Sequence, residues 1–166
     1  MRRAAVILAA LLAAGCDGPP PAVRLTLETD LAMPAELDEI HVLAAASRTE
    51  AGQICGPTSR GFRLSATDAL PLRLVIERGE TYTVWVWARI EGFAGGRRIL
   101  AREVVHAWPD EGVTEVTVRL ERACVDRTCG AADQCIEGSC RPLQMPGLLD
   151  DAERIDADRP CSGDTP

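Results

Sequence analysis

The chain has 166 residues, and its 25 acidic residues outnumber the 18 basic ones, which gives a formal net charge of −7. This length is enough for one domain with short appendages. The negative charge argues against a nucleic-acid-binding surface, which would need to be basic. Every basic residue is Arg, and Asn is absent, which removes any N-glycosylation site. The seven cysteines favour an oxidising compartment.

The first 15 residues form a predicted signal peptide. Two Arg residues follow Met1, and residues 4–14 are an unbroken apolar run. As a helix this run would be about 16 Å long, whereas the hydrocarbon core of a membrane is about 30 Å thick. The run is therefore too short to span a membrane and fits the apolar segment of a secretory signal.

Small residues, Ala13 to Gly15, directly precede Cys16. This junction resembles the lipobox of bacterial lipoproteins, although Ala13 stands where that pattern usually has Leu. The resemblance implies a diacylglycerol anchor on Cys16, with the outer membrane favoured and the periplasmic face of the inner membrane as the alternative. The other interpretation is an ordinary secretory signal followed by a chance Cys. Residues 16–21, with three consecutive Pro residues, are expected to form a stiff spacer after the lipidated Cys.

Residues 22–122 alternate between polar and apolar side chains with a period of two. The alternation runs through 23–28, 39–44, 62–64, 72–77, 82–90 and 116–121, and residues 99–107 are apolar on both faces. Turn-forming residues at 78–80, 92–96 and 109–112 separate these runs. The pattern predicts an all-β fold, an antiparallel β-sandwich of about seven strands with an immunoglobulin-like or transthyretin-like topology. The longest irregular stretch, 47–61, is expected to be a mobile or partner-facing loop.

Four cysteines in residues 123–142 follow the last predicted strand with the spacing C-x4-C-x5-C-x4-C: Cys124, Cys129, Cys135 and Cys140. So short a segment cannot build its own core, so disulfides are expected to hold it. Four cysteines permit three connectivities, and the spacing resembles half of an EGF-like module, which implies the pairs 124–135 and 129–140. Zinc is the alternative, but zinc modules usually have closer Cys pairs, often with His, and no His lies nearby.

Two further cysteines and the acidic C-terminal segment complete the chain. With Cys16 lipidated, Cys55 and Cys161 remain, either bridged to each other or unpaired. Residues 143–166 are poor in apolar residues and rich in acids, which predicts a disordered, solvated tail. The pair Asp156 and Asp158 could begin a calcium loop, but the further oxygen ligands and turn glycine of such a loop are missing.

The sequence of segments resembles a class of uncharacterised lipoproteins from high-GC Gram-negative bacteria. The resemblance covers residues 25–149 in layout. It rests on the lipobox, the Pro-rich spacer, a β domain ending in Val-Arg-Leu-Glu-Arg-Ala-Cys, and the segment Cys-Gly-Ala-Ala-Asp-Gln-Cys-Ile-Glu-Gly-Ser-Cys that follows. It implies an architecture and a location in the cell envelope, and it implies no reaction.

Catalysis has little support in the sequence. Nucleophile-elbow, phosphate-loop, dinucleotide-binding and zinc-protease motifs are missing. His41 and His106 fall in predicted strands, and the adjacent acids Asp38 and Glu39 would point to opposite faces of a strand. We therefore expect no enzyme, cofactor, metal site or nucleic-acid partner. The favoured role is a non-catalytic structural or protein-interaction module that meets other envelope proteins.

Trp85 and Trp87 supply the one positive indication of ligand binding. They lie two residues apart and share a strand face, opposite the aliphatic face of Val86, Ala88 and Ile90. If the aliphatic face packs in the core, the indoles lie on the outer surface, where they could stack on an envelope glycan or dock a partner. Alternatively, a loop, the Cys-rich segment or the second sheet covers them.

Overall fold

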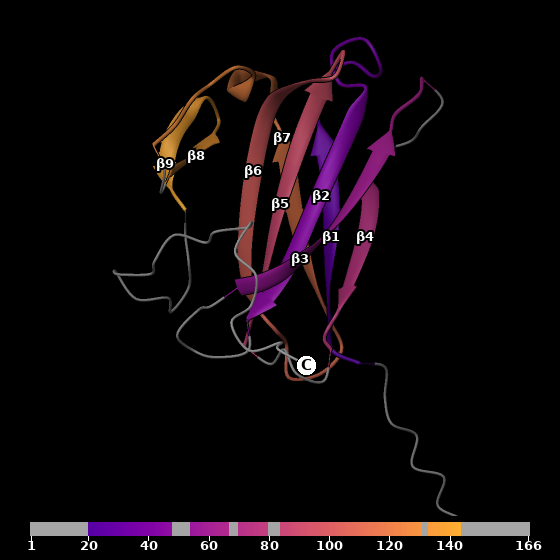
Figure 1. The fold of residues 1–166 in the computed structure, drawn as a ribbon, viewed down its shortest axis with the longest axis vertical. Helices are drawn as coiled ribbons and strands as arrows, with labels where there is room; N and C mark the ends of the chain where they lie inside the picture. Colours follow the sequence, from indigo (N-terminus) through magenta and orange to yellow (C-terminus); the bar gives the residue numbers. More distant parts are fainter. Residues whose placement is uncertain (1–19, 48–53, 67–69, 80–83, 131–132, 144–166) are drawn as a thin grey trace, which may run out of the picture.

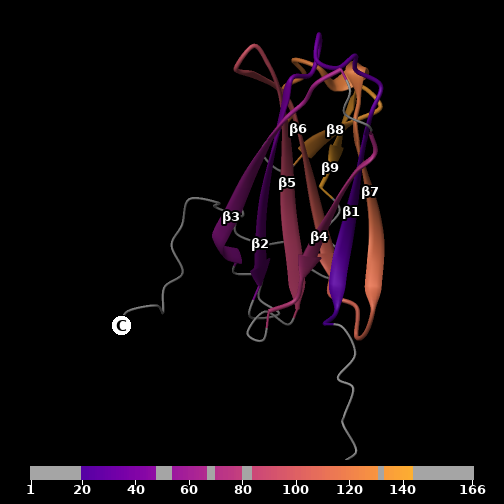
Figure 2. The ribbon, with the colours of Figure 1, turned by 90° about the vertical axis from the view of Figure 1, so that its right-hand side faces the viewer.

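The computed structural model describes residues 20–47, 54–66, 70–79, 84–130 and 133–143, with residues 47 and 54–57 described by their backbone alone. In these residues the chain is nearly all strand and forms two sheets packed face to face, with a small third sheet beside them (Figures 1 and 2). The predicted all-β sandwich with a disulfide-stapled C-terminal module is confirmed.

The first sheet has the order β4-β1-β7 and the second the order β3-β2-β5-β6. The strands of the first sheet are β1 (Ala22–Thr29), β4 (Leu72–Glu77) and β7 (Val113–Leu120). Those of the second are β2 (Glu39–Ser47), β3 (Ile54–Arg63), β5 (Trp85–Ala94) and β6 (Arg97–Ala107). A short 3-10 helix, η1 (Arg122–Cys124), leads to the hairpin of β8 (Asp133–Ile136) and β9 (Ser139–Pro142).

The strand order decides between the two predicted topologies. In an immunoglobulin domain the first two strands belong to the same sheet. Here β1 lies between β4 and β7, whereas β2 lies in the other sheet between β3 and β5. This excludes the immunoglobulin-like order and leaves the transthyretin-like alternative. One pair departs from the antiparallel expectation, because β1 and β7 run parallel.

The core lies between the two sheets and follows the predicted alternation. Val23, Leu25 and Leu27 of β1 are each 1% exposed, and the aliphatic face of β5 packs in the same cluster. The opposite face of the first sheet carries charged pairs such as Arg24–Glu115 and Arg119–Glu28. This division gives the first sheet one buried and one solvated face, as expected for an antiparallel sandwich.

The prediction of a long loop at 47–61 is wrong, because strand β3 begins at Ile54 and occupies the second half of this segment. Ala44 pairs with Thr58 and Ala46 with Cys55, so Gly56 and Pro57 lie opposite the single residue Ala45. This is a β-bulge. Since β3 is an edge strand, it can accept a Pro that donates no ladder hydrogen bond. Gly56 and Pro57, which are typical of turns, here form a bulge in an edge strand.

The expected turn at 92–96 is shorter than predicted. Strand β5 continues through Gly92 to Ala94, and the turn consists of Gly95 and Gly96, both with positive φ. Gly92 is needed for packing, because a Cβ there would lie 2.8 Å from Leu37 Cδ1. Position 92 therefore requires glycine because the buried Leu37 side chain approaches the backbone closely there, and not because the chain turns.

Candidate functional site

The C-terminal module, residues 123–142, is closed by two disulfides. Cys124 bonds to Cys135 and Cys129 to Cys140, with Cα–Cα distances of 5.6 and 5.5 Å. The predicted pairing is therefore confirmed. The first disulfide is buried, at 2% and 5% exposure of its two residues, whereas Cys140 is exposed. The buried disulfide takes the place of a small hydrophobic core.

The module docks along the outer edge of β6, at the left in Figure 1. The backbone N–H of Asp126 donates to the carbonyl of Ile99 at 2.8 Å, and the N–H of Glu103 donates to the Gln134 side chain at 3.3 Å. Arg102, half-buried, donates to the carbonyl of Cys135. Burial lowers the pKa of Arg102. Two of these bonds satisfy backbone groups of β6, at Ile99 and Glu103, so the module covers the edge strand over this stretch.

Trp85 and Trp87 lie on the outer face of the second sheet, as the alternation predicts, but Trp87 is not open to a ligand. It is 1% exposed and packs with Ala45 and Val105 in a second apolar cluster, which Trp85 and Leu143 join from the side. Its Nε1 donates to Glu103 at 3.2 Å. Leu143 directly follows the Cys module and packs against this cluster. The indole face is therefore partly covered by the chain after the module, which agrees with the second interpretation, that another segment covers the two Trp residues.

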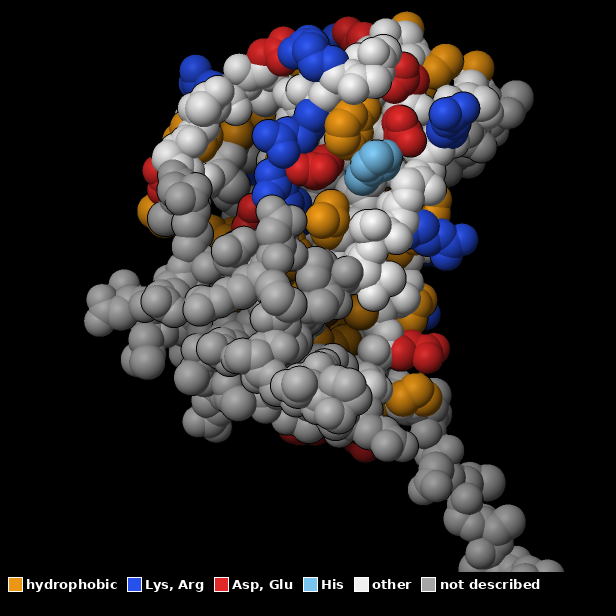
Figure 3. Space-filling model, viewed as in Figure 1, with side chains coloured by type: hydrophobic (Ala, Val, Ile, Leu, Met, Phe, Trp, Pro, Cys, Tyr) orange, Lys and Arg blue, Asp and Glu red, His pale blue; other side chains and the backbone are white. Residues whose placement is uncertain are grey.

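The upper part of the same outer face carries charged and apolar side chains side by side (Figure 3). His41 Nε2 lies 3.0 Å from Glu39 Oε1, and its ring lies 4.6 Å from the Phe93 ring. His106 Nδ1 lies 2.6 Å from the carbonyl of Ala107. Both histidines thus have local structural contacts. In the described part of the chain, no group of three or more His, Cys, Asp or Glu residues could hold a metal ion.

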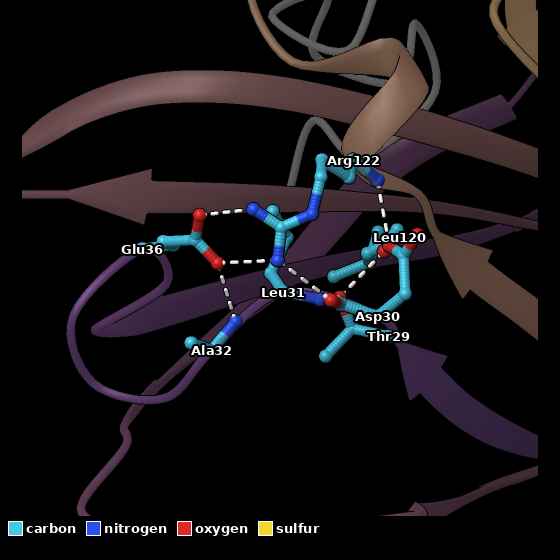
Figure 4. A network of polar contacts seen from close by, with 7 residues as sticks. All are labelled: Thr29, Asp30, Leu31, Ala32, Glu36, Leu120 and Arg122. Atoms are coloured by element: carbon cyan, nitrogen blue, oxygen red, sulfur yellow. Dashed lines mark hydrogen bonds and ion pairs between the residues drawn. The ribbon is translucent and has the colours of Figure 1, made fainter.

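A polar network fastens the β1–β2 connection to the segment after β7 (Figure 4). The Arg122 guanidinium makes a two-point contact with the Glu36 carboxylate, and Arg122 Nη2 also donates to the carbonyl of Asp30 at 3.0 Å. Glu36 accepts from the N–H of Ala32 at 2.7 Å. The Arg122 hydrogen bond, followed by the Ala32 one, lowers the pKa of Glu36. Sequence reasoning missed this network, because Glu36 and Arg122 are 86 residues apart in the sequence and meet only in the folded sandwich.

Among the described residues, no strand covers the opposite edge of the sandwich, between β3 and β4. A groove of about 500 Å³ runs there between the sheets. Val42 and Trp108 line it from the core, and Arg60, Phe62 and Leu74 line it from the two edge strands. The indole nitrogen of Trp108 is buried without a hydrogen-bond partner. Sequence reasoning did not find this groove, since it depends on which distant strands become edges.

Comparison of the chain with protein-family models, curated proteins and solved structures found no match. Cys16, Cys161 and residues 144–166 of the tail, with the calcium alternative at Asp156 and Asp158, lie outside the described residues, as does the Cys55 side chain. No helix among the described residues is long and apolar enough to cross a membrane. The two disulfides indicate an oxidising, exported environment.

Proposed function

We propose that the protein is a lipid-anchored component of the cell envelope that acts as a non-catalytic protein-interaction module. The observation that carries this proposal is a difference between the two edges of the sandwich. A disulfide-stapled module covers β6 at Ile99 and Glu103, whereas among the described residues a groove remains uncovered between β3 and β4. Edge strands that remain open are surfaces on which other chains can pair. The disulfides support export, and the lipobox resemblance at Cys16 supports the anchor.

The anchor is tested by metabolic labelling with a radioactive fatty acid. The change Cys16→Ala is expected to abolish incorporation and to leave an uncleaved or soluble form, because no other residue would accept the lipid. Cys161→Ala is the matched control and is expected to keep the label. Full labelling of the Cys16→Ala variant would reject the anchor.

The interaction role is tested by cross-linking in intact cells, which is expected to give defined protein adducts. Envelope glycan binding is the alternative function. It would depend on half-buried Trp85, because Trp87 offers no open ring face. Titration of tryptophan fluorescence with cell-wall glycans separates the two functions. Saturable quenching with a glycan, without protein adducts, would favour the alternative and contradict the interaction role.

A further inference from the structure

At the edge formed by β3 and β4, the first sheet is one strand narrower than the second. The first sheet has three strands and the second has four. On the β3 wall of the groove, the alternate residues Thr58, Arg60 and Phe62 line it, and the first two are exposed. In the described residues the first sheet ends at β4, and no further strand lies beside it to cover them. A fourth strand beside β4 would face this part of β3 and complete the first sheet.

The β4 wall shows that the groove reaches the backbone edge of that strand. Five consecutive residues, 73–77, line it. Because successive side chains of a strand point to opposite faces, one face alone could contribute only alternate residues. The groove therefore meets the free edge of β4 itself. In an antiparallel pair, alternate residues turn their N–H and C=O groups away from the partner, so β4 presents backbone groups to the groove.

The side chains around this edge have a definite chemistry. Leu74 and Ile76 are half-buried and face the core side, where they leave apolar surface in the groove. Arg73 and Arg60 flank the groove from opposite walls, and the Arg60 guanidinium lies 5.1 Å from the centre of the Phe62 ring. Within the described residues, neither guanidinium forms an ion pair with a carboxylate. Glu77 also lines the groove, so its rim carries two positive charges and one negative charge. The groove thus combines a strand edge, an apolar interior and an excess of positive charge at its rim.

We propose that this groove binds an extended acidic peptide segment of a partner protein, which adds to β4 as a fourth strand of the first sheet. Its inward side chains are apolar and pack against Leu74, Ile76 and Phe62, and an outward carboxylate pairs with Arg73 across the strands. Backbone hydrogen bonds supply affinity in this mode of recognition, and alternate side chains supply specificity. The proposal rests on the proposed interaction function and names the surface and partner chemistry for it.

A peptide strand explains the groove better than a small apolar anion does. An anion such as a fatty acid would use the apolar interior and one Arg, but it would leave the backbone groups of β4 unpaired. The lining residues of the groove also follow two strands, through Thr58 to Phe62 on β3 and through residues 73–77 on β4. Both features suit an extended main chain, so the small anion is treated below as the competing outcome.

The test uses the 15N-labelled full chain in detergent and the probe acetyl-Thr-Val-Glu-Val-Thr-Val-Thr-amide. In a heteronuclear NMR titration we expect saturable shifts of the amides of residues 72–77 and 58–62, with the β6 and β7 amides unmoved. The same peptide with Pro in place of its central Val is expected not to bind, because Pro removes a backbone donor and does not fit within a pairing strand. Binding of both peptides with equal affinity would overturn strand addition.

Charge reversal tests the proposed pairing. Arg73→Glu is expected to weaken binding of the Glu peptide about threefold to tenfold, since like charges opposite each other repel. A peptide with Lys in place of Glu is expected to bind this variant better than it binds the unchanged protein. Arg141→Glu is the matched control: it makes the same charge change on β9, on the exposed surface of the Cys module, and should leave binding unchanged.

Three further results would overturn the proposal: no amide shifts with any of the peptides, shifts confined to another edge, or shifts of residues 72–77 with octanoate but not with the peptide. The last result would assign the groove to an apolar anion. These results are distinguishable from failure of the proposed function. Cells can still yield protein adducts through another surface when the peptide does not bind.

Discussion

The two edges of the sandwich differ in how their backbone groups are treated. At the β6 edge the Cys module approaches closely enough for Asp126 and Gln134 to bond with backbone groups of the strand. At the β3 and β4 edge a groove of about 500 Å³ remains. An exposed edge strand is a template for association, and most proteins block it. In the described part of the chain, a covalently stapled segment covers part of one edge, and the other edge has no such cover.

The difference also assigns a role to the disulfides. The module has 20 residues between positions 123 and 142, too few for a core, and it can cover β6 only if cross-links hold its shape. Arg102 and the Arg97–Asp126 ion pair then orient it on the strand. The staple thus serves the sealed edge, whereas the open edge has no comparable cover among the described residues.

The largest expected effect is at Trp87, on β5 next to the covered edge strand β6. Trp87→Ala should lower the free energy of unfolding by about 3–5 kcal/mol, because it leaves a large cavity in an apolar cluster. Its 1% exposure sets this expectation. Val75→Ala at the open edge is the comparison, since that side chain is 51% exposed, and it should change stability by less than about 0.5 kcal/mol. Urea denaturation followed by circular dichroism measures both.

Equal effects of the two changes would contradict the difference in burial between the side next to β6 and the free side of β4. Trp85→Ala adds a graded control, because Trp85 is half-buried in the same cluster. Its effect should fall between those of Trp87→Ala and Val75→Ala. If Trp87→Ala were as mild as Val75→Ala, the indole would have to be solvent-accessible in solution, and the glycan alternative would regain its aromatic platform.

The next effect concerns the two disulfides, which close loops of the same sequence separation, 11 residues. In the chain-entropy model each should contribute about 2–4 kcal/mol to the stability of the module. Replacing Cys124 and Cys135 with Ala should cost more than replacing Cys129 and Cys140, because the first pair is buried. Amide hydrogen exchange of β8 and β9 measures the loss, with β1 as the internal reference.

We expect β1 and β5 to stay protected in both double variants, since the sandwich has its own core between the sheets. Loss of protection throughout the sandwich would show instead that the module and the sheets unfold as one unit. In that case docking of the Cys module on β6 would be required for the sandwich to fold. The two edges would then differ in what they contribute to stability rather than in their accessibility to a partner.

The sequence predicted what depends on local period. The two-residue alternation separated Val86 and Ile90 from Trp85 and Trp87, and the structure places them on opposite faces as expected. It could not say which strands would become edges, because edge position follows from long-range pairing such as β1 with β7. The groove beside Arg60 and Arg73 is a consequence of that pairing, and it was therefore missed.

Composition misled where one residue type serves two purposes. Gly56 and Pro57 indicated a loop, yet they form a bulge on an edge strand, where Pro is tolerated. Arg102 lies in β6 between Ala101 and Glu103, and nothing in these neighbours shows that its guanidinium donates to the carbonyl of Cys135. The disulfide pairing was predicted correctly, because the resemblance to half of an EGF-like module already contained the long-range information.

The smallest expected effect is at the exposed network of Glu36 and Arg122, a third region that is neither covalently sealed nor open. The Arg122 hydrogen bond lowers the folded-state pKa of Glu36 below its ordinary value, which is about 4.3 in an unfolded chain. The contribution to stability is therefore fully present above that ordinary value and is lost as the pH falls through the lowered folded-state pKa.

We expect Glu36→Gln to lower the melting temperature slightly at pH 7, and the difference from the unchanged protein to vanish at the acid end of a melting series. Arg122→Gln should show the same pH-dependent loss, because it removes the same pair, and a further loss at every pH, because it also removes the hydrogen bond to the Asp30 carbonyl. Added salt should reduce the pH-dependent part of both effects, because the pair is exposed to screening ions. A Glu36→Gln difference that persists at low pH would mean that the side chain acts there through packing or neutral hydrogen bonds, and that the network is not held by charge.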